Sequence, residues 1–190
     1  MNTEWISEFT GPREARAICH QCYRINVDAT SWVFATNGHV MLAMEAALGD
    51  FSFAPCYQSV ITSWLKKELG DRITTVANLR AWAGPDTFEY CTHCDENELD
   101  VNGECLHCEG YGYIDFEYRN GRINDVLINR YLIAKAFWHL PDGPVHVVTD
   151  GPERTVFFIG SGWRMVVMPM RYASGPITEV VEFSAWDNIA

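Results

Sequence analysis

Two pairs of cysteines, Cys91-Thr-His-Cys94 and Cys105-Leu-His-Cys108, carry the clearest chemical signal in this sequence. A C-x-x-C turn points two thiol sulfurs the same way, so two such turns can enclose one Zn²⁺ ion at about 2.3 Å from each sulfur. The polar segment between the pairs contains Asn102-Gly103, a dipeptide that favours a tight turn. The spacing therefore predicts a small hairpin that holds one structural zinc ion through Cys91, Cys94, Cys105 and Cys108.

A site closed by four cysteines predicts a structural role, because it leaves no coordination position open for a catalytic water. His93 and His107 lie inside the two pairs and could each replace a cysteine as ligand, although exposed loop residues also fit this pattern. Four unrelated thiols or two disulfides are the alternatives, and disulfides would need an oxidising compartment. The stretch from Cys105 to Gly112 reads C-x-x-C-x-G-x-G and resembles one repeat of the DnaJ-type zinc domain; over eight residues, this implies local geometry and no chaperone activity.

The other three cysteines do not complete a second site of this kind. Cys19 and Cys22 form a third C-x-x-C without a fourth pair, so we expect free thiols that are buried or half-buried, and Cys56 is expected to serve packing. An enzyme that uses C-x-x-C thiols is a further alternative. The sequence contains no G-x-S-x-G, P-loop, H-E-x-x-H or dinucleotide-binding motif, and we therefore predict a protein that is not an enzyme.

Composition narrows the class of protein. A chain of 190 residues with 48% apolar content suits one domain, or one domain with a small insert. The net charge of −11 argues against a nucleic-acid binder with a basic surface overall, because affinity for phosphate comes mainly from Lys and Arg. The first residues do not read as a signal peptide, and no apolar run approaches the roughly 20 residues that span a bilayer. We expect a cytoplasmic protein with no membrane partner.

Strand patterns dominate the elements that must position these residues. Two apolar runs around Asn37-Gly38 predict a hairpin, and a second hairpin is expected around Ser161-Gly162, after a strand over 145–148. A strand over 111–118 is expected to turn back at Asn120-Gly121. Helices are expected from about residue 12, over 58–69, within 72–84 after a strand, and after Asn129, which could cap the helix that Pro141 ends.

The two hairpins resemble each other in sequence. At a fixed offset of 124 residues, Phe34 matches Phe158, Gly38 matches Gly162, and two methionines match as well. Since each half also places a helix ahead of its strands, we predict an α+β fold made of two β-α-β-β-β repeats. The expected organisation is a first repeat with inserted helices over 1–85, the zinc hairpin over 86–114, the second repeat over 115–171 and a C-terminal extension over 172–190.

Three segments carry a family resemblance. Ala35-Thr-Asn-Gly-His-Val-Met-Leu-Ala43 looks like the A-T-D-G-H-R-L-A motif of the bacterial DNA polymerase III beta sliding clamp. Arg164-Met-Val-Val-Met-Pro-Met-Arg171 is similar to the Y-V-V-M-P-M-R stretch that ends that protein, and Asn129-Arg-Tyr-Leu132 also fits the clamp repeat. The resemblance covers roughly residues 1–45 and 115–171 and implies the DNA-clamp fold.

The resemblance also implies a groove that receives short peptides from replication proteins. Carried over residue by residue, its lining would be Thr36, Asn37, Gly38, His39, Val40, Met41, Met168, Pro169, Met170 and Arg171. Flexible, polarizable methionines suit such a groove, although the same methionines could simply pack in the core. The sequence departs from the family at Asn37, where the clamp has Asp, and at Val40, where it has Arg. In the clamp, the two segments also come from neighbouring domains.

A DNA-facing surface is the second implication of the resemblance. The cations on the two expected repeat helices are Arg13, Arg16, Arg130 and Lys135, and a solvated helix face is the alternative for them. A ring around DNA in this family needs six such domains, so one domain would have to form a homo-oligomer, join another clamp, or not encircle DNA.

We therefore predict a non-enzymatic, clamp-like accessory protein of DNA replication or repair. Its partners would be double-stranded DNA and replication proteins such as a polymerase, a clamp loader or a clamp. An origin on a phage or mobile element would suit so reduced a clamp. The alternative is a zinc-ribbon module that binds a replication protein as a decoy or inhibitor, for which the acidic surface would serve competition at a basic partner.

Overall fold

A seven-stranded antiparallel sheet forms the centre of the computed structural model, which describes residues 6, 21–46, 58–84, 89–90, 113–114, 120–149, 154–170 and 180–187. Each strand pairs with its neighbours through antiparallel ladders. From one edge to the other the strands are β1 (Tyr23–Val27), β2 (Thr30–Thr36), β3 (Val40–Glu45), β11 (Trp163–Val167), β10 (Val156–Gly160), β9 (Pro144–Thr149) and β4 (Arg72–Thr75).

Both faces of this sheet are covered, which explains why its central strands are apolar on both sides. All five residues of β10 are buried, as are five of the six residues of β3. We call the face that carries Leu42, Phe158 and Met165 the first face, and the face that carries Phe34 and Phe157 the second face. The edge strand β1 instead alternates between more and less buried residues, the pattern of a strand with one covered face.

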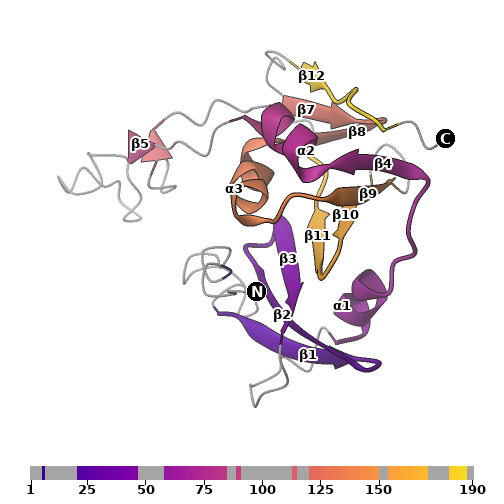
Figure 1. Ribbon diagram of the computed structural model, residues 1–190. Coiled ribbons are helices and arrows are strands. Elements are labelled where there is room, and N and C mark those ends of the chain that lie inside the picture. Colours follow the sequence, from indigo (N-terminus) through magenta and orange to yellow (C-terminus); the bar gives the residue numbers. More distant parts are fainter. Residues whose placement is uncertain are drawn as a thin grey trace, which may run out of the picture.

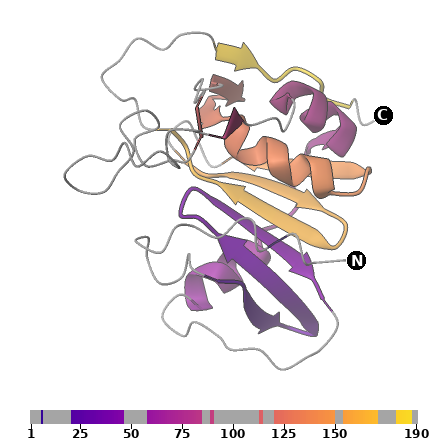
Figure 2. The same cartoon turned by 90° about the vertical axis from the view of Figure 1, so that its left-hand side faces the viewer.

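Three helices cover the two faces. On the first face lie α2 (Val76–Ala83) and α3 (Tyr131–His139), whose apolar side chains share one core with that face. The second face is covered by α1 (Gln58–Leu65), which buries Ile61 and Leu65 in a smaller core. Figures 1 and 2 show α1 on the opposite side of the sheet from α3. The larger core therefore lies on the side of α2 and α3.

A second, three-stranded sheet completes the first-face core. Its strands, in spatial order, are β12 (Val180–Glu182), β7 (Asn120–Ile123) and β8 (Val126–Asn129), and β12 runs parallel to β7. Ile123, Val126 and Ile128 pack in the same core as α2 and α3. A separate two-stranded ladder joins β5 (Glu89–Tyr90) to β6 (Tyr113–Ile114). The C-terminal segment thus returns to the domain, although the resemblance offered no counterpart for it.

The two predicted hairpins form as β2–β3 and β10–β11, and they meet at the middle of the sheet through β3 and β11 (Figure 1). Their ladders correspond at an offset of 123 residues: Thr36 pairs with Met41, and Ile159 pairs with Arg164. The central cross-strand pair, Leu42 with Met165, has the same offset, as a local twofold axis requires.

The offset of 124 residues predicted from sequence identities is therefore wrong by one. It matches Phe34 with Phe158, yet these rings lie in the cores on opposite faces of the sheet. A slip of one residue moves every side chain of a strand to the other face. At the observed offset, Phe34 corresponds to Phe157, and both rings lie on the second face.

Two local predictions around the small sheet are also wrong. Asn120-Gly121 lies within β7, and the turn forms at Asn124-Asp125, where Asn124 has a φ of 51°. Gly121 is required there for close packing, because a Cβ atom on it would collide with Arg130 and Trp82. Asn129 does not cap α3, since it is a buried strand residue paired with Asn120. The N-cap residue is Arg130, which makes no side-chain capping hydrogen bond.

Other predicted elements are confirmed. The strand and short helix expected within 72–84 are β4 and α2, and the helix expected over 58–69 is α1, which ends at Leu65. The helix expected from about residue 12 lies outside the described residues. Within the part of the chain that the structure describes, no helix is long and apolar enough to cross a membrane.

Candidate functional site

The two segments of the expected groove lie next to each other. Because β3 pairs with β11, the turn that precedes β3 adjoins the residues that follow β11. The backbone N–H of Met168 donates to the carbonyl oxygen of His39 at 2.8 Å, and the N–H of Met170 donates to the carbonyl oxygen of Leu127 at 2.9 Å. Residues 168–170 therefore connect the large sheet to β8, with the turn at Gly38-His39 beside them.

Side chains hold the turn between Thr36 and Val40 in place. The Oδ1 atom of Asn37 accepts hydrogen bonds from the N–H groups of His39 and Val40 at 3.0 and 2.9 Å. The hydroxyl of Thr36 donates to the carbonyl oxygen of Val40 at 2.8 Å and accepts from the N–H of Gly38 at 3.0 Å. Gly38 has a φ of 90°, a conformation that suits glycine. The turn thus has a defined shape without contributions from another chain.

Not every residue assigned to the groove is accessible. Val40 and Met41 are buried in the cores on opposite faces of the sheet, so packing is their role, as it is for the fully buried Met44 and Met165. Gly38 and His39 are exposed. The remaining described members are half-buried, which leaves part of each available to a ligand: Thr36, Asn37, Met168, Pro169 and Met170. Arg171 lies outside the described residues.

Two of the four cations assigned to a DNA-facing surface are described. The Arg130 guanidinium donates to the carbonyl oxygen of Trp82 and lies over its ring, 5.7 Å from the centroid. Arg130 is therefore engaged in packing β7, α2 and α3 together. Lys135 is half-buried on α3. Arg13 and Arg16 lie outside the described residues, and DNA contact by any of the four stays a prediction.

The four cysteines of the expected zinc site lie outside the described residues, but the residues flanking them do not. Tyr90 pairs with Tyr113, and Glu89 pairs with Ile114, in the antiparallel β5–β6 ladder. This ladder joins the two ends of the segment that contains all four cysteines. Among the described residues, no cluster of three or more His, Cys, Asp or Glu could hold a metal ion.

Cys22 is the described member of the third C-x-x-C pair. It is half-buried, as expected, and packs beside the first-face core. Burial raises the pKa of the Cys22 thiol above its ordinary value. A raised pKa keeps a thiol protonated near neutral pH, whereas the thiolate is the nucleophile and metal ligand. The environment of Cys22 therefore does not favour thiol chemistry.

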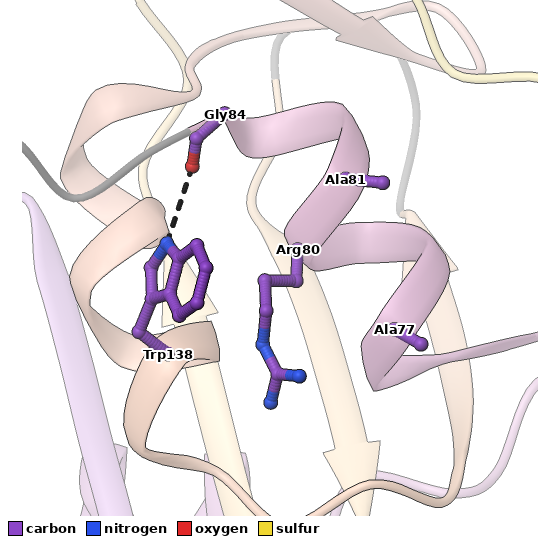
Figure 3. A pocket seen from close by; sticks show the side chains of 5 residues that line it. All are labelled: Ala77, Arg80, Ala81, Gly84 and Trp138. Carbon is purple, nitrogen blue, oxygen red and sulfur yellow. Dashed lines mark hydrogen bonds between the residues drawn. The ribbon is translucent and has the colours of Figure 1, made fainter.

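A shallow depression between α2 and α3 involves two residues that the sequence did not suggest as a site (Figure 3). The Arg80 guanidinium donates to the carbonyl oxygens of Phe137 and Leu140 at 3.1 and 3.2 Å, and lies 5.4 Å from the centroid of the Trp138 ring. Trp138 is 50% exposed, and its Nε1–H donates to the Gly84 carbonyl oxygen at 3.3 Å. Arg80 thus stabilises the C-terminus of α3, and the depression has no set of side chains suited to catalysis.

Phe137 and Trp138 are neighbours on α3, and only the first of them is buried. Neighbouring residues on a helix point about 100° apart, so both rings could not face the same core fully. Phe137 is buried against Phe158, with ring centroids 5.4 Å apart, and Trp138 is directed outward. Ile133 and Phe137 are four residues apart and lie on the same face of the helix, so their spacing could have predicted that Phe137, and not Trp138, is buried.

Arg164, inside the segment that resembles the clamp C-terminus, also has a packing role. Its Nη1 atom donates to the carbonyl oxygens of Gly160 and Trp163 at 3.0 and 3.1 Å, and its guanidinium lies 5.5 Å from the centroid of the Trp32 ring. Burial lowers the pKa of Arg164, and the charge of Glu45 partly offsets this effect. Arg164 corresponds to Met41 in the other hairpin, and both residues stabilise the centre of the sheet.

Comparison with solved structures identifies similar folds. A sliding clamp from Pseudomonas aeruginosa solved with a ligand has a TM-score of 0.52 and 12% identity over 90% of this chain and 63% of that chain. A second structure of the Pseudomonas aeruginosa clamp has a TM-score of 0.50 and 12% identity, over 87% and 62% of the two chains. The DNA polymerase III beta clamp from Bartonella birtlesii has a TM-score of 0.47 and 9% identity, over 90% and 62%.

No family model matches the sequence, and no curated protein matches it either. The chain spans about three fifths of the length of these clamp chains, at 62–63%. At such low identity the likeness is evidence of fold alone. The chain therefore has a mixed, sheet-rich fold with a few helices that resembles the sliding-clamp domain.

Proposed function

We propose that this chain is a non-enzymatic, sliding-clamp-related accessory protein of DNA replication or repair that binds short peptide segments of replication proteins. The observation that carries the proposal is the hydrogen bond from the Met168 N–H to the His39 carbonyl oxygen, at 2.8 Å. It joins the two segments that resemble the peptide-binding groove of the clamp family, within a fold similar to that of the Pseudomonas aeruginosa clamp.

The chemistry of these segments suits an apolar peptide. Met168, Pro169 and Met170 each keep part of their surface accessible, and methionine side chains can repack around different guests. The adjacent turn is already ordered by the Asn37 and Thr36 side chains, so its backbone would lose little conformational freedom on binding. Exposed His39 would lie at the rim, where its ring could contact polar groups of the guest.

We also propose that the domain is a pair of β-α-β-β-β repeats. The matched ladders of the β2–β3 and β10–β11 hairpins support this, as does the order of β8, α3, β9, β10 and β11 along the chain. A ring around DNA would require several copies, or a partnership with another clamp. The net charge of −11 is compatible with this only if DNA meets a local patch of cations, such as the one to which Lys135 would contribute.

Peptide binding can be tested by fluorescence anisotropy with labelled clamp-binding peptides from bacterial polymerases. We expect Met168→Ala and Met170→Ala each to weaken binding about tenfold, the effect of losing one important apolar contact. Leu69→Ala is the matched control, because Leu69 is 59% exposed and precedes β4, the edge strand that β9 and β10 separate from β11. Failure of the unmodified protein to bind, or equal losses in all three variants, would contradict the proposal.

We further propose that Cys91, Cys94, Cys105 and Cys108 hold one structural zinc ion. The β5–β6 ladder supports this, because it closes the ends of the segment into a hairpin. Four thiolates suit Zn²⁺ as a donor set. Metal analysis of the purified protein should give about one zinc per chain, and Cys91→Ser combined with Cys94→Ser should remove it.

The zinc hairpin should be separable from the main fold. The β5–β6 ladder forms a two-stranded sheet of its own, and neither strand pairs with the seven-stranded or the three-stranded sheet. We therefore expect chelation to leave the thermal transition of the main sheet in place, as followed by far-ultraviolet circular dichroism. A chain that binds zinc through other residues, or that unfolds throughout when the zinc is removed, would contradict this assignment.

A further inference from the structure

The C-terminal segment 180–187 makes hydrogen bonds to three separate elements, β7, α2 and β4. In β12, Val181 pairs with Gly121 of β7, and the Val181 carbonyl oxygen accepts a hydrogen bond from the Trp82 indole at 3.1 Å. Phe183 is buried against Trp82, with ring centroids 5.3 Å apart. The N–H of Phe183 donates to the Arg122 carbonyl oxygen at 2.8 Å. Residues 180–183 therefore anchor the segment in the first-face core.

The next residues reach the edge of the large sheet. The N–H of Asp187 donates to the carbonyl oxygen of Ile73 in β4 at 2.8 Å, and the two residues form an antiparallel bridge. The Thr74 hydroxyl donates to the Ala185 carbonyl oxygen at 2.7 Å. Trp186 packs edge-on against Phe183, 4.7 Å between centroids, and the Arg72 guanidinium lies 5.4 Å from the centroid of the Trp186 ring.

This contact covers the outward-facing backbone of Ile73, in the middle of the edge strand β4. In an antiparallel ladder, the N–H and C=O groups of a residue point to the same side, and neighbouring residues alternate. Since the Ile73 carbonyl faces Asp187, the backbone groups of Arg72 and Thr74 face β9. Beyond Ile73, the chain turns into α2, and the N–H of Val76 donates to the Gly143 carbonyl oxygen at 3.0 Å. Ile73 is therefore the centre of the β4 edge.

We propose that residues 185–187 are an intramolecular cap that prevents the β4 edge from pairing with a strand of a second copy of this chain. Uncovered sheet edges are templates for pairing between chains, and proteins protect them with loops, charges or short strands. The side chains of Ala185 and Asp187 are exposed, whereas the Trp186 ring packs beside Phe183 and the first-face core. The cap is therefore held by its backbone contacts and by one aromatic ring. Because Phe183 is buried just before the cap, it holds residues 185–187 close to Ile73, and a single bridge to β4 is enough.

The cap has a consequence for assembly that does not depend on the proposed peptide-binding function. A contact between copies through the edge of β4 requires residues 185–187 to detach first. An oligomer of the intact chain must therefore use other surfaces. Loss of the cap, by cleavage or by competition from a strand, would add a new way for copies to associate.

Removal of residues 185–190 tests the cap, because it leaves Phe183 and β12 in place. We expect the shortened chain to show about a twofold rise in weight-average mass by light scattering as concentration increases, beyond any rise in the full-length chain. Adding Ile73→Pro should abolish the new association, because proline lacks the N–H that an added strand needs on the outward side. Association that survives Ile73→Pro would overturn the proposal.

A matched pair of full-length variants tests the cap even if the shortened chain does not fold. Asp187→Pro removes the N–H that bonds to Ile73, whereas Asp187→Ala removes the carboxylate and keeps that N–H. We expect Asp187→Pro to associate like the shortened chain and Asp187→Ala to behave like the unmodified protein, with circular dichroism unchanged in both. An unchanged mass for Asp187→Pro, or the same rise for both variants, would overturn the proposal.

Discussion

The β2–β3 and β10–β11 hairpins share a backbone register, yet their turns are stabilised by different interactions. In the first hairpin Asn37 stands opposite Val40, linked by a hydrogen bond of 3.3 Å from the Asn37 N–H to the Val40 carbonyl oxygen. In the second, Gly160 pairs with Trp163 at the equivalent positions. The first turn is held by polar side chains and presents exposed residues. The second leaves space above a glycine, and the Trp163 ring fills that space.

The position of glycine differs between the two turns. Gly38, with a φ of 90°, is the first central residue of its turn, whereas Gly162, with a φ of 75°, is the second. Two-residue turns take glycine at different central positions according to their type. Aligning one glycine with the other therefore shifts the comparison by one residue. The shared feature is the register of the ladder, and the turn chemistry is free to diverge.

The two hairpins should differ most in how much stability depends on the equivalent residues Trp163 and Val40. Both are buried in the first-face core. Trp163→Ala should lower the free energy of unfolding by about 3–5 kcal/mol, because it removes a large buried ring and leaves a cavity. Val40→Ala should cost about 2 kcal/mol, since it removes only two methyl groups. Urea unfolding of the two variants measures both values. Equal losses would mean that Trp163 does not fill the space assigned to it.

Substitutions at the equivalent residues Gly160 and Asn37 should lower the free energy of unfolding by less than Trp163→Ala does. Gly160→Ala should cost about 1–3 kcal/mol, because the new methyl group would collide with the Trp163 ring. Asn37→Ala should cost about 1 kcal/mol for a different reason, the loss of an acceptor for two backbone N–H groups.

The collision can be separated from other causes by a double variant. In a Trp163→Leu background the smaller side chain should relieve the clash, so adding Gly160→Ala should then cost less than it does alone. The unfolding free energies of the two single variants and the double variant give this coupling. Additive losses would show that the Trp163 ring is not what makes Gly160 intolerant of a side chain.

These hairpins also show how far the sequence could predict the fold. Apolar runs on either side of Asn37-Gly38 and Ser161-Gly162 were sufficient to locate both. The same Asn-Gly signal failed at residues 120 and 121, because Gly121 serves close packing against Trp82 and Arg130 and not a turn. Local composition does not distinguish a glycine needed for its φ from one needed for its size.

The candidate site depended on information that no local pattern contains. Sequence resemblance selected residues 36–41 and 168–171, but their proximity comes from the pairing of β3 with β11, more than 100 residues apart. The C-terminal segment was unpredictable for a similar reason. Val180, Val181 and Phe183 form too short an apolar run to indicate a partner, and its contacts with β4 and β7 are long-range.

The smallest change in stability should come from His39→Ala, although its effect on binding should be clear. The structure uses the backbone of His39, which donates to Asn37 and accepts from Met168, while the residue is exposed. We expect the free energy of unfolding to change by less than about 0.5 kcal/mol. If this turn adjoins the peptide site, anisotropy titration should show weaker binding. Ser161→Ala, an exposed change in the other turn, should alter neither quantity, and equal binding by both variants would place the peptide site away from His39.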